Sequence, residues 1–208
     1  VESEQASLFE AKRDEIIAGF KVQQAENSLQ SKSALIGKLL NSSQIFSQII
    51  ASQAGLSRDN QSDIRQLGEL ITGVTPNVTQ ILGEGRALGA SALGLGFLNS
   101  ASSTRFDELL VQIEKVQGEY GLKLQDALTS SPAAGQALAG PADTSKATLK
   151  KAAELIEEQV VMADALDAPW PAFFGQVSSL MEQTYRLNDA ALGFLGVQLQ
   201  HRLEQNRS

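Results

Sequence analysis

Few residues of this chain have types and spacing that could bind a small molecule, and Arg86 is the foremost of them. It lies in the glycine-rich string LGEGRALGASALGLGF, residues 82–97. An arginine on such a small-residue surface can face a groove between helices and hold a carboxylate with two parallel hydrogen bonds. The alternative is a surface arginine, or one paired with Glu84 or Glu119. Lys38 is a weaker candidate for the same anion-binding role.

Catalysis and metal binding find little support in the residue types. The chain has one histidine, His201, and no cysteine. His201 lies near the C-terminus among Gln, Arg and Glu, and no serine or carboxylate constellation points to it, so we expect a solvated surface residue. The acidic residues are scattered rather than spaced as a calcium loop. We therefore expect no catalytic residue, no metal and no cofactor.

The glycines of the same string have two interpretations. Gly83-x-Gly85 could open a phosphate-binding loop, but the third glycine is misplaced and no strand precedes it. Gly89, Gly94 and Gly96 recur within the same expected helix, and small residues at such spacing let two helices approach closely. Close packing between helices is the favoured interpretation.

The composition favours helices and argues against one class of partner. Of the 208 residues, 42% are apolar, 20% charged and 5% aromatic, a mixture that favours helices over a sheet. The net charge of −7 argues against a nucleic-acid surface, which needs clustered Lys and Arg. No run of about 18 apolar residues could span a membrane. Because both ends read as helices cut in mid-course, we expect a soluble fragment of a longer protein.

Apolar residues at helical spacing predict four long helices. Their expected ranges are 2–56, 59–98, 104–129 and 144–207. The last is interrupted at DAPWPAFF, residues 167–174, and residues 99–104 are expected to form a polar turn. The segment 130–145, rich in Pro, Gly, Ala and Ser, is expected to be the only long loop.

The lengths of these helices predict how they pack. At about 1.5 Å per residue the first would span roughly 80 Å and the broken last one roughly 90 Å, with roughly 60 and 45 Å for the two between them. We therefore expect an all-α fold, an elongated antiparallel four-helix bundle with long first and last helices and both chain ends at one pole.

Several irregularities would fall at one height of that bundle. Pro76 and Trp170, which lies between Pro169 and Pro171, would both be roughly 55 Å from the pole with the termini, and Tyr120 about as far. A proline removes a backbone donor and bends a helix, so the layer predicts a waist, hinged at the three prolines, between two stacked helical modules. Trp170 and Tyr120 would line a pocket at this waist or fill it as packed plugs.

Three stretches carry a resemblance to known receptors. They are SQAGLSRD, PNVTQILGEGRALG and the final LNDAALGFLGVQLQHRLEQ. In this order, after a long helix, they resemble the extracytoplasmic helical sensor regions of bacterial methyl-accepting chemotaxis proteins, sensor histidine kinases and some diguanylate cyclases. The resemblance covers most of the chain.

The resemblance implies one periplasmic sensor domain over residues 1–208 of an inner-membrane protein, flanked by transmembrane helices and without enzymatic activity. Such domains generally form homodimers, bind a small and often anionic ligand, and pass on a shift of the last helix. Some instead bind a periplasmic binding protein at the distal tip. The candidate ligand-binding residues are Arg86, Trp170, Tyr120 and Lys38, of which only Arg86 matches a recurrent position.

With the waist as the boundary, the domain would have two halves. The membrane-proximal half would hold residues 1–36, 77–120 and 171–208, and the distal half residues 37–76 and 121–170. An alternative function is that of a secreted structural protein that docks partner helices. It predicts a sizeable exposed apolar stripe on one face.

Overall fold

The computed structural model describes residues 58–207, and every regular element in that part of the chain is helical. The α-helices are α2 (Arg58–Glu69), α3 (Thr75–Leu95), α4 (Ser100–Thr129), α5 (Pro132–Lys146), α6 (Thr148–Ile156) and α7 (Trp170–Arg207), and two π-helical segments are η2 (Leu70–Val74) and η3 (Glu157–Val161). The predicted all-α class is confirmed. The predicted first helix, residues 2–56, lies outside the described residues, and so does Lys38.

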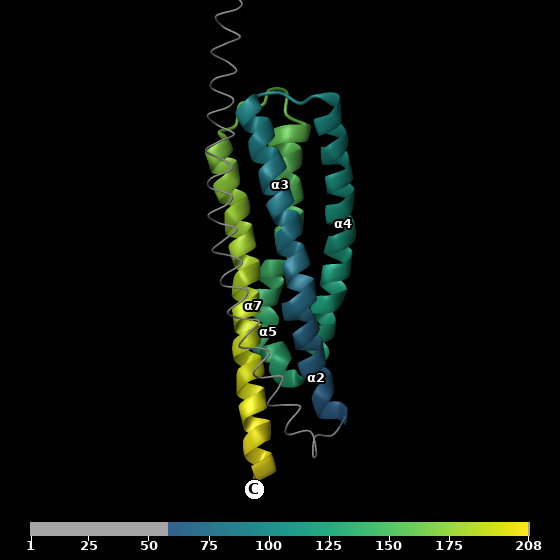
Figure 1. Ribbon diagram of the computed structural model, residues 1–208, viewed down its shortest axis with the longest axis vertical. Coiled ribbons are helices and arrows are strands. Elements are labelled where there is room, and N and C mark those ends of the chain that lie inside the picture. The colour runs from purple at the N-terminus through teal and green to yellow at the C-terminus, as the bar shows by residue number, and fades with distance from the viewer. Residues whose placement is uncertain (1–57, 208) are drawn as a thin grey trace, which may run out of the picture.

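The described chain runs up and down along one long axis (Figure 1). The segment α2–η2–α3 ascends, α4 descends, α5–α6–η3 ascends and α7 descends. Side-chain contacts agree with these directions. Thr75 and Arg86 of α3 bond to Asn188 and Ser178 of α7, so residue numbers rise along one helix as they fall along the other.

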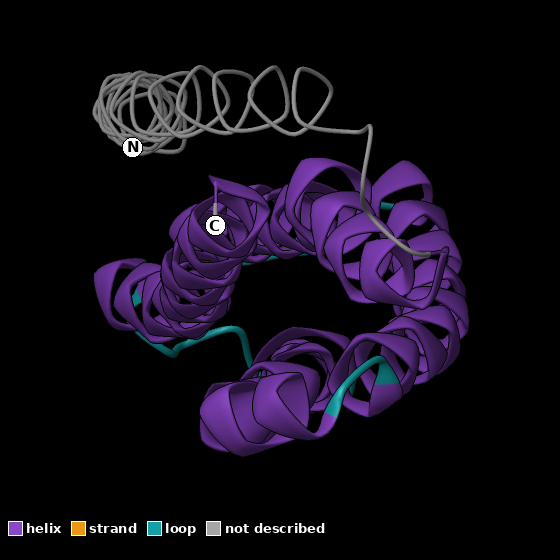
Figure 2. Cartoon of the chain, turned by 90° about the horizontal axis from the view of Figure 1, so that it is seen from below, coloured by secondary structure: helices purple, strands orange, loops and turns teal. Residues whose placement is uncertain are grey.

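One apolar core lies between these segments, which surround it when the molecule is viewed end-on (Figure 2). Helix α4 shows how the sequence builds it, because Phe106, Leu109 and Ile113 recur every three or four residues and are all buried. Burying each such side chain stabilises the fold by about 1.5–3 kcal/mol. The core is continuous across the predicted waist, with Leu70 on one side of Pro76 and Val78 on the other.

Helix α4 confirms the end of the predicted third helix and corrects its start. It ends at Thr129, as expected. It begins at Ser100, inside the predicted turn 99–104, because Asn99 is the N-cap and its side-chain oxygen accepts a hydrogen bond from the Ser102 amide at 2.8 Å. Asparagine is one of the best N-cap residues, since its side chain satisfies an otherwise unpaired amide of the first turn.

The prediction of a long loop at 130–145 is wrong, because most of this segment is helix α5. Ser131 caps the helix by accepting a hydrogen bond from the Ala134 amide at 3.1 Å, and Pro132 takes the first helical position. A proline costs little there, since the first amides of a helix have no partner within the helix. Leu138 then turns inward and is buried in the core.

The prediction of one broken helix over 144–207 is also wrong. Residues 162–169 reverse the chain, and α7 starts at Trp170 and runs antiparallel to α6–η3 (Figure 1). Gln159 and Gln176, on the two sides of the reversal, form a side-chain hydrogen bond of 3.2 Å. Trp170 therefore lies at the start of a helix and not at a kink within one.

Trp170 does not lie at the level of Pro76 and Tyr120. The hydroxyl of Thr75, beside Pro76, donates to Asn188 at 2.5 Å. Asn188 follows Trp170 by 18 residues in α7, a distance of about 27 Å along the helix axis. The predicted shared layer is therefore wrong for Trp170 and for the prolines that flank it.

The glycines of the string 82–97 allow close helix packing, as predicted. A Cβ atom on Gly89 would lie 2.3 Å from the ring of Phe173 in α7, and one on Gly85 would lie 3.1 Å from Ile156 in α6. Gly96 differs from the prediction that it lies within the helix. It follows the last residue of α3 with a φ of 79°, a left-handed conformation that glycine adopts readily at a helix C-terminus.

Candidate functional site

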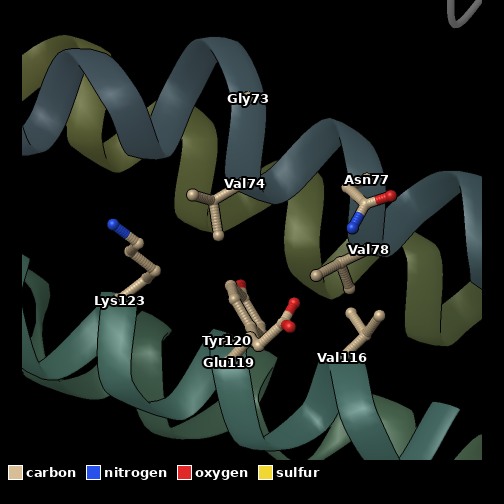
Figure 3. A pocket seen from close by; sticks show the side chains of 8 residues that line it. All are labelled: Gly73, Val74, Asn77, Val78, Val116, Glu119, Tyr120 and Lys123. Atoms are coloured by element: carbon tan, nitrogen blue, oxygen red, sulfur yellow. The ribbon is translucent and has the colours of Figure 1, made fainter. Parts of the chain in front are cut away.

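A pocket of about 230 Å³ lies between the η2–α3 segment and α4 (Figure 3). Valine side chains and the Tyr120 ring form its apolar lining, and an amide, a carboxylate and an ammonium group stand around it. The lining residues are Gly73, Val74, Asn77, Val78, Val116, Glu119, Tyr120 and Lys123. Small-molecule sites generally combine apolar walls with a few polar groups in this way.

A local change of helix geometry shapes one wall of the pocket. The amide of Thr75 donates to the carbonyl of Leu70, five residues back, where an α-helix would use the carbonyl four residues back. The next residue, Pro76, has no amide proton and interrupts the α-helical ladder at the same point. Such π-helical turns insert one extra residue into a helix and are frequent at functional sites.

The Tyr120 side chain connects the pocket to two other segments. Its hydroxyl and Ser145 Oγ of α5 form a hydrogen bond of 2.5 Å, and Ser145 Oγ forms another of 2.8 Å with Thr184 Oγ1 of α7. All three residues are almost fully buried. Burial raises the pKa of Tyr120 to about 12, although the hydrogen bonds to Ser145 and Thr184 act in the opposite direction. The phenol is therefore neutral at physiological pH.

The opposite wall of the pocket is also bonded to α7. Thr75 Oγ1, next to the wall residue Val74, donates to Asn188 Oδ1, and both side chains are buried. Asn188 lies one helical turn beyond Thr184, the α7 residue of the Tyr120 network. Both walls thus reach the same stretch of α7 through buried hydrogen bonds.

Arg86 belongs to a second cluster, 11 residues and about 16 Å farther along α3 than Thr75. Its guanidinium donates to Ser178 Oγ at 2.9 Å and stacks over the Phe174 ring, with 4.3 Å from Cζ to the ring centroid. Trp170 packs edge-on against the same ring, at 6.4 Å between centroids. Burial lowers the pKa of Arg86.

Arg86 is neither a surface arginine nor paired with a carboxylate, so both alternatives considered for it are wrong. It is 8% exposed. Glu84 pairs instead with Arg105 at 3.2 Å, and Glu119 lines the pocket. A buried guanidinium held by one hydroxyl and one aromatic ring is an unusual arrangement, since buried charges are normally paired.

The structure divides the predicted ligand-binding residues between two places. Arg86 and Trp170 come together, because both contact the Phe174 ring. Tyr120 lies in the pocket instead. The fourth candidate, Lys38, lies outside the described residues.

Sequence reasoning missed the polar residues that join the pocket to α7. Thr184 and Asn188 lie within the apolar stripe of α7, between Leu180 and Ala191, and Ser145 lies at the end of α5. Small polar residues at core positions of an amphipathic helix are a usable signal, because a buried hydroxyl or amide needs a hydrogen-bond partner.

Comparisons of the chain with protein-family models, with curated proteins and with solved structures find no match. Across residues 58–207, no helix has the length and hydrophobicity needed to span a bilayer.

Proposed function

We propose that this chain is the signal-input domain of a bacterial transmembrane receptor, in which a small molecule binds between α3 and α4 and displaces α7. The observation that carries the proposal is the bonding of both pocket walls to one stretch of α7. Thr75 beside one wall bonds to Asn188, and Tyr120 in the other reaches Thr184 through Ser145.

The energies of these bonds suit a two-state switch. A buried hydrogen bond contributes about 1 kcal/mol net, and leaving one partner unsatisfied costs about 1–3 kcal/mol. Typical coupling energies between two sites are about 1–3 kcal/mol. A ligand that moves α3 relative to α4 would strain Thr75–Asn188 or Tyr120–Ser145, and either change is sufficient to bias the position of α7.

The receptor context rests on the resemblance of the sequence to extracytoplasmic sensor regions. The resemblance implies a periplasmic domain of a homodimeric inner-membrane protein with a chemotaxis, kinase or cyclase output, and we propose this context for the chain. In this context α7 is the last helix of the domain, the element that such receptors use to pass on a shift.

The alternative of a structural protein that docks partner helices gains no support from the described surface. It predicts an apolar stripe on one face, whereas the large exposed apolar side chains of residues 58–207 are dispersed over α4, α7 and two loops. They are Phe97, Val111, Leu122, Met162 and Val197. In the predicted bundle the segment 130–145 would be a loop at the distal tip that a binding protein could contact, but this segment is largely helix α5.

A thermal-shift screen of the 208-residue chain tests binding at the pocket. A ligand at about 100 times its Kd stabilises the folded state by about 2.7 kcal/mol. Val74→Phe, which places a larger side chain in the pocket, should remove the shift, and Val111→Phe on the exposed face of α4 should retain it. A shift that survives Val74→Phe but disappears in Arg86→Ala would place binding at Arg86 and contradict the proposal.

Transmission to α7 has its own test in the intact receptor. Thr75→Val removes the hydroxyl that bonds to Asn188 while keeping the shape of the side chain, and should change basal output and reduce the response to ligand. Thr79→Val is the matched control, because the Thr79 hydroxyl bonds only within α3, to the carbonyl of Pro76. Equal responses to ligand from Thr75→Val and Thr79→Val would contradict transmission through the Thr75–Asn188 hydrogen bond.

A further inference from the structure

The charged groups around the pocket are not equally engaged. Lys123 Nζ lies 3.7 Å from Glu69 Oε2, across the gap between α4 and α2. The side chains of Glu119 and Asn77 are exposed at the rim of the pocket, and neither has a hydrogen bond or ion pair with any described residue. Among the described lining residues, the unpaired charge is therefore negative.

The two unpaired groups come from different helices and lie on the two sides of the same space. In Figure 3 the Glu119 carboxylate extends from α4 toward α3, and Asn77 stands above it on α3. Val78 points into the space from the α3 side, and Val116 stands beside Glu119 on α4. An ammonium group at this position could donate to the carboxylate and to the amide oxygen at once, since it has three donors and no acceptor.

We propose that the ligand of this pocket is a small aliphatic amine, bound in its ammonium form with Glu119 as counter-charge and its alkyl chain against the valines. The inference rests on the proposed function only in that the pocket is the input site. A charge-assisted hydrogen bond to a carboxylate is about twice as strong as a neutral one. The pocket volume of about 230 Å³ is smaller than the roughly 300–1,000 Å³ of pockets for drug-sized ligands, which limits the amine to a short chain.

A carboxylate ligand fits the same space poorly. It would lie next to Glu119, which repels it, and Lys123, the cation among the described lining residues, already has Glu69 as a neighbour at 3.7 Å. Arg86 is bonded to Ser178 and lies about 16 Å farther along α3. The pocket thus differs in charge preference from the anion site that the sequence predicts around Arg86.

Isothermal titration calorimetry of the 208-residue chain with n-butylammonium and with butyrate tests the inference, because the two probes match in length and differ in charge. We expect n-butylammonium to bind at least about tenfold more tightly than butyrate at low ionic strength. Glu119→Gln should weaken n-butylammonium by about tenfold or more. Glu114→Gln, an exposed carboxylate on the same helix outside the pocket, should leave the affinity unchanged.

The other outcomes overturn the inference and separate it from the proposed function. Butyrate that binds as tightly as n-butylammonium, with both lost in Val74→Phe, would refute the amine and leave the pocket as the input site. If Val74→Phe still binds n-butylammonium, the amine binds outside this pocket, and this result would refute both the amine inference and the pocket as the input site. Absence of both heat and thermal stabilisation with ethyl-, butyl- and hexylammonium up to about 10 mM would refute the amine. Glu119→Lys gives an independent check, since it should abolish n-butylammonium binding and create butyrate binding.

Discussion

The buried phenol of Tyr120 should make the stability of the fold depend on alkaline pH. Its pKa is raised to about 12, from the ordinary value of 10.0, because burial disfavours the phenolate. A group with a raised pKa holds its proton more tightly in the folded state than in the unfolded state. Its contribution is complete below about pH 10 and is lost as the pH rises toward 12. A shift of two pKa units corresponds in full to roughly 3 kcal/mol.

Urea unfolding at intervals from pH 8 to pH 12 measures this loss, with Tyr120→Phe as the comparison. Near pH 8 the variant should be less stable by about 1 kcal/mol, because Ser145 loses one of its two side-chain hydrogen-bond partners and keeps Thr184. Between about pH 10 and pH 12 the wild type should lose about 2 kcal/mol more than the variant, and the remainder above pH 12. Tyr185→Phe, which removes the other tyrosine of the chain, controls for general alkaline effects. Parallel pH profiles of the wild type and Tyr120→Phe would refute the reasoning.

Three further changes test the packing. Gly89→Ala should lower the free energy of unfolding by about 1–3 kcal/mol, because its Cβ would lie 2.3 Å from Phe173. Gly118→Ala is the control and should raise the free energy of unfolding by about 0.5–1 kcal/mol, because nothing lies within 4 Å of its Cβ. Equal effects of the two variants in urea unfolding would contradict the close approach of α3 and α7. Arg86→Lys should cost about 0.5–2 kcal/mol through lost stacking on an aromatic ring, and an unchanged urea midpoint would argue against that contact. Pro171→Ala should leave helical content by circular dichroism unchanged, since it lies in the first turn of α7; a gain in helix would favour a straightened kink.

The fold could be predicted where one helix carries its own signals. Helix α4 has a regular apolar stripe and polar flanks, and its end at Thr129 follows from them. The start of α5 is ambiguous in the sequence, because proline and glycine are also typical of a loop. Ser131 followed by Pro132 is also the pattern of a capped helix, and the burial of Leu138 decides between the two.

The reversal at 162–169 could not be predicted from local pattern. A kink and a turn between antiparallel helices both leave helical periodicity on each side of a proline pair. A contact between the two sides distinguishes a turn from a kink, and nothing in the sequence indicates that Gln159 and Gln176 contact each other. The height along the bundle, predicted at about 1.5 Å per residue, is correct for Tyr120, which shares a pocket with residues beside Pro76. It is wrong for Trp170, because the prediction treated residues 144–207 as one helix and the chain reverses direction at 162–169.

The start of α7 at Trp170 changes what a conformational signal would have to cross. Thr184 and Asn188, where the pocket networks reach α7, lie C-terminal to the proline pair, and Pro171 is the last proline of the chain. The 20 residues from Asn188 to Arg207 are uninterrupted helix, about 30 Å long. A hinge at Trp170 is therefore unnecessary, because it would lie on the far side of the pocket from the C-terminal end. In the proposed mechanism a displacement at Asn188 is carried toward that end by a rigid helix, and its size is set at the pocket.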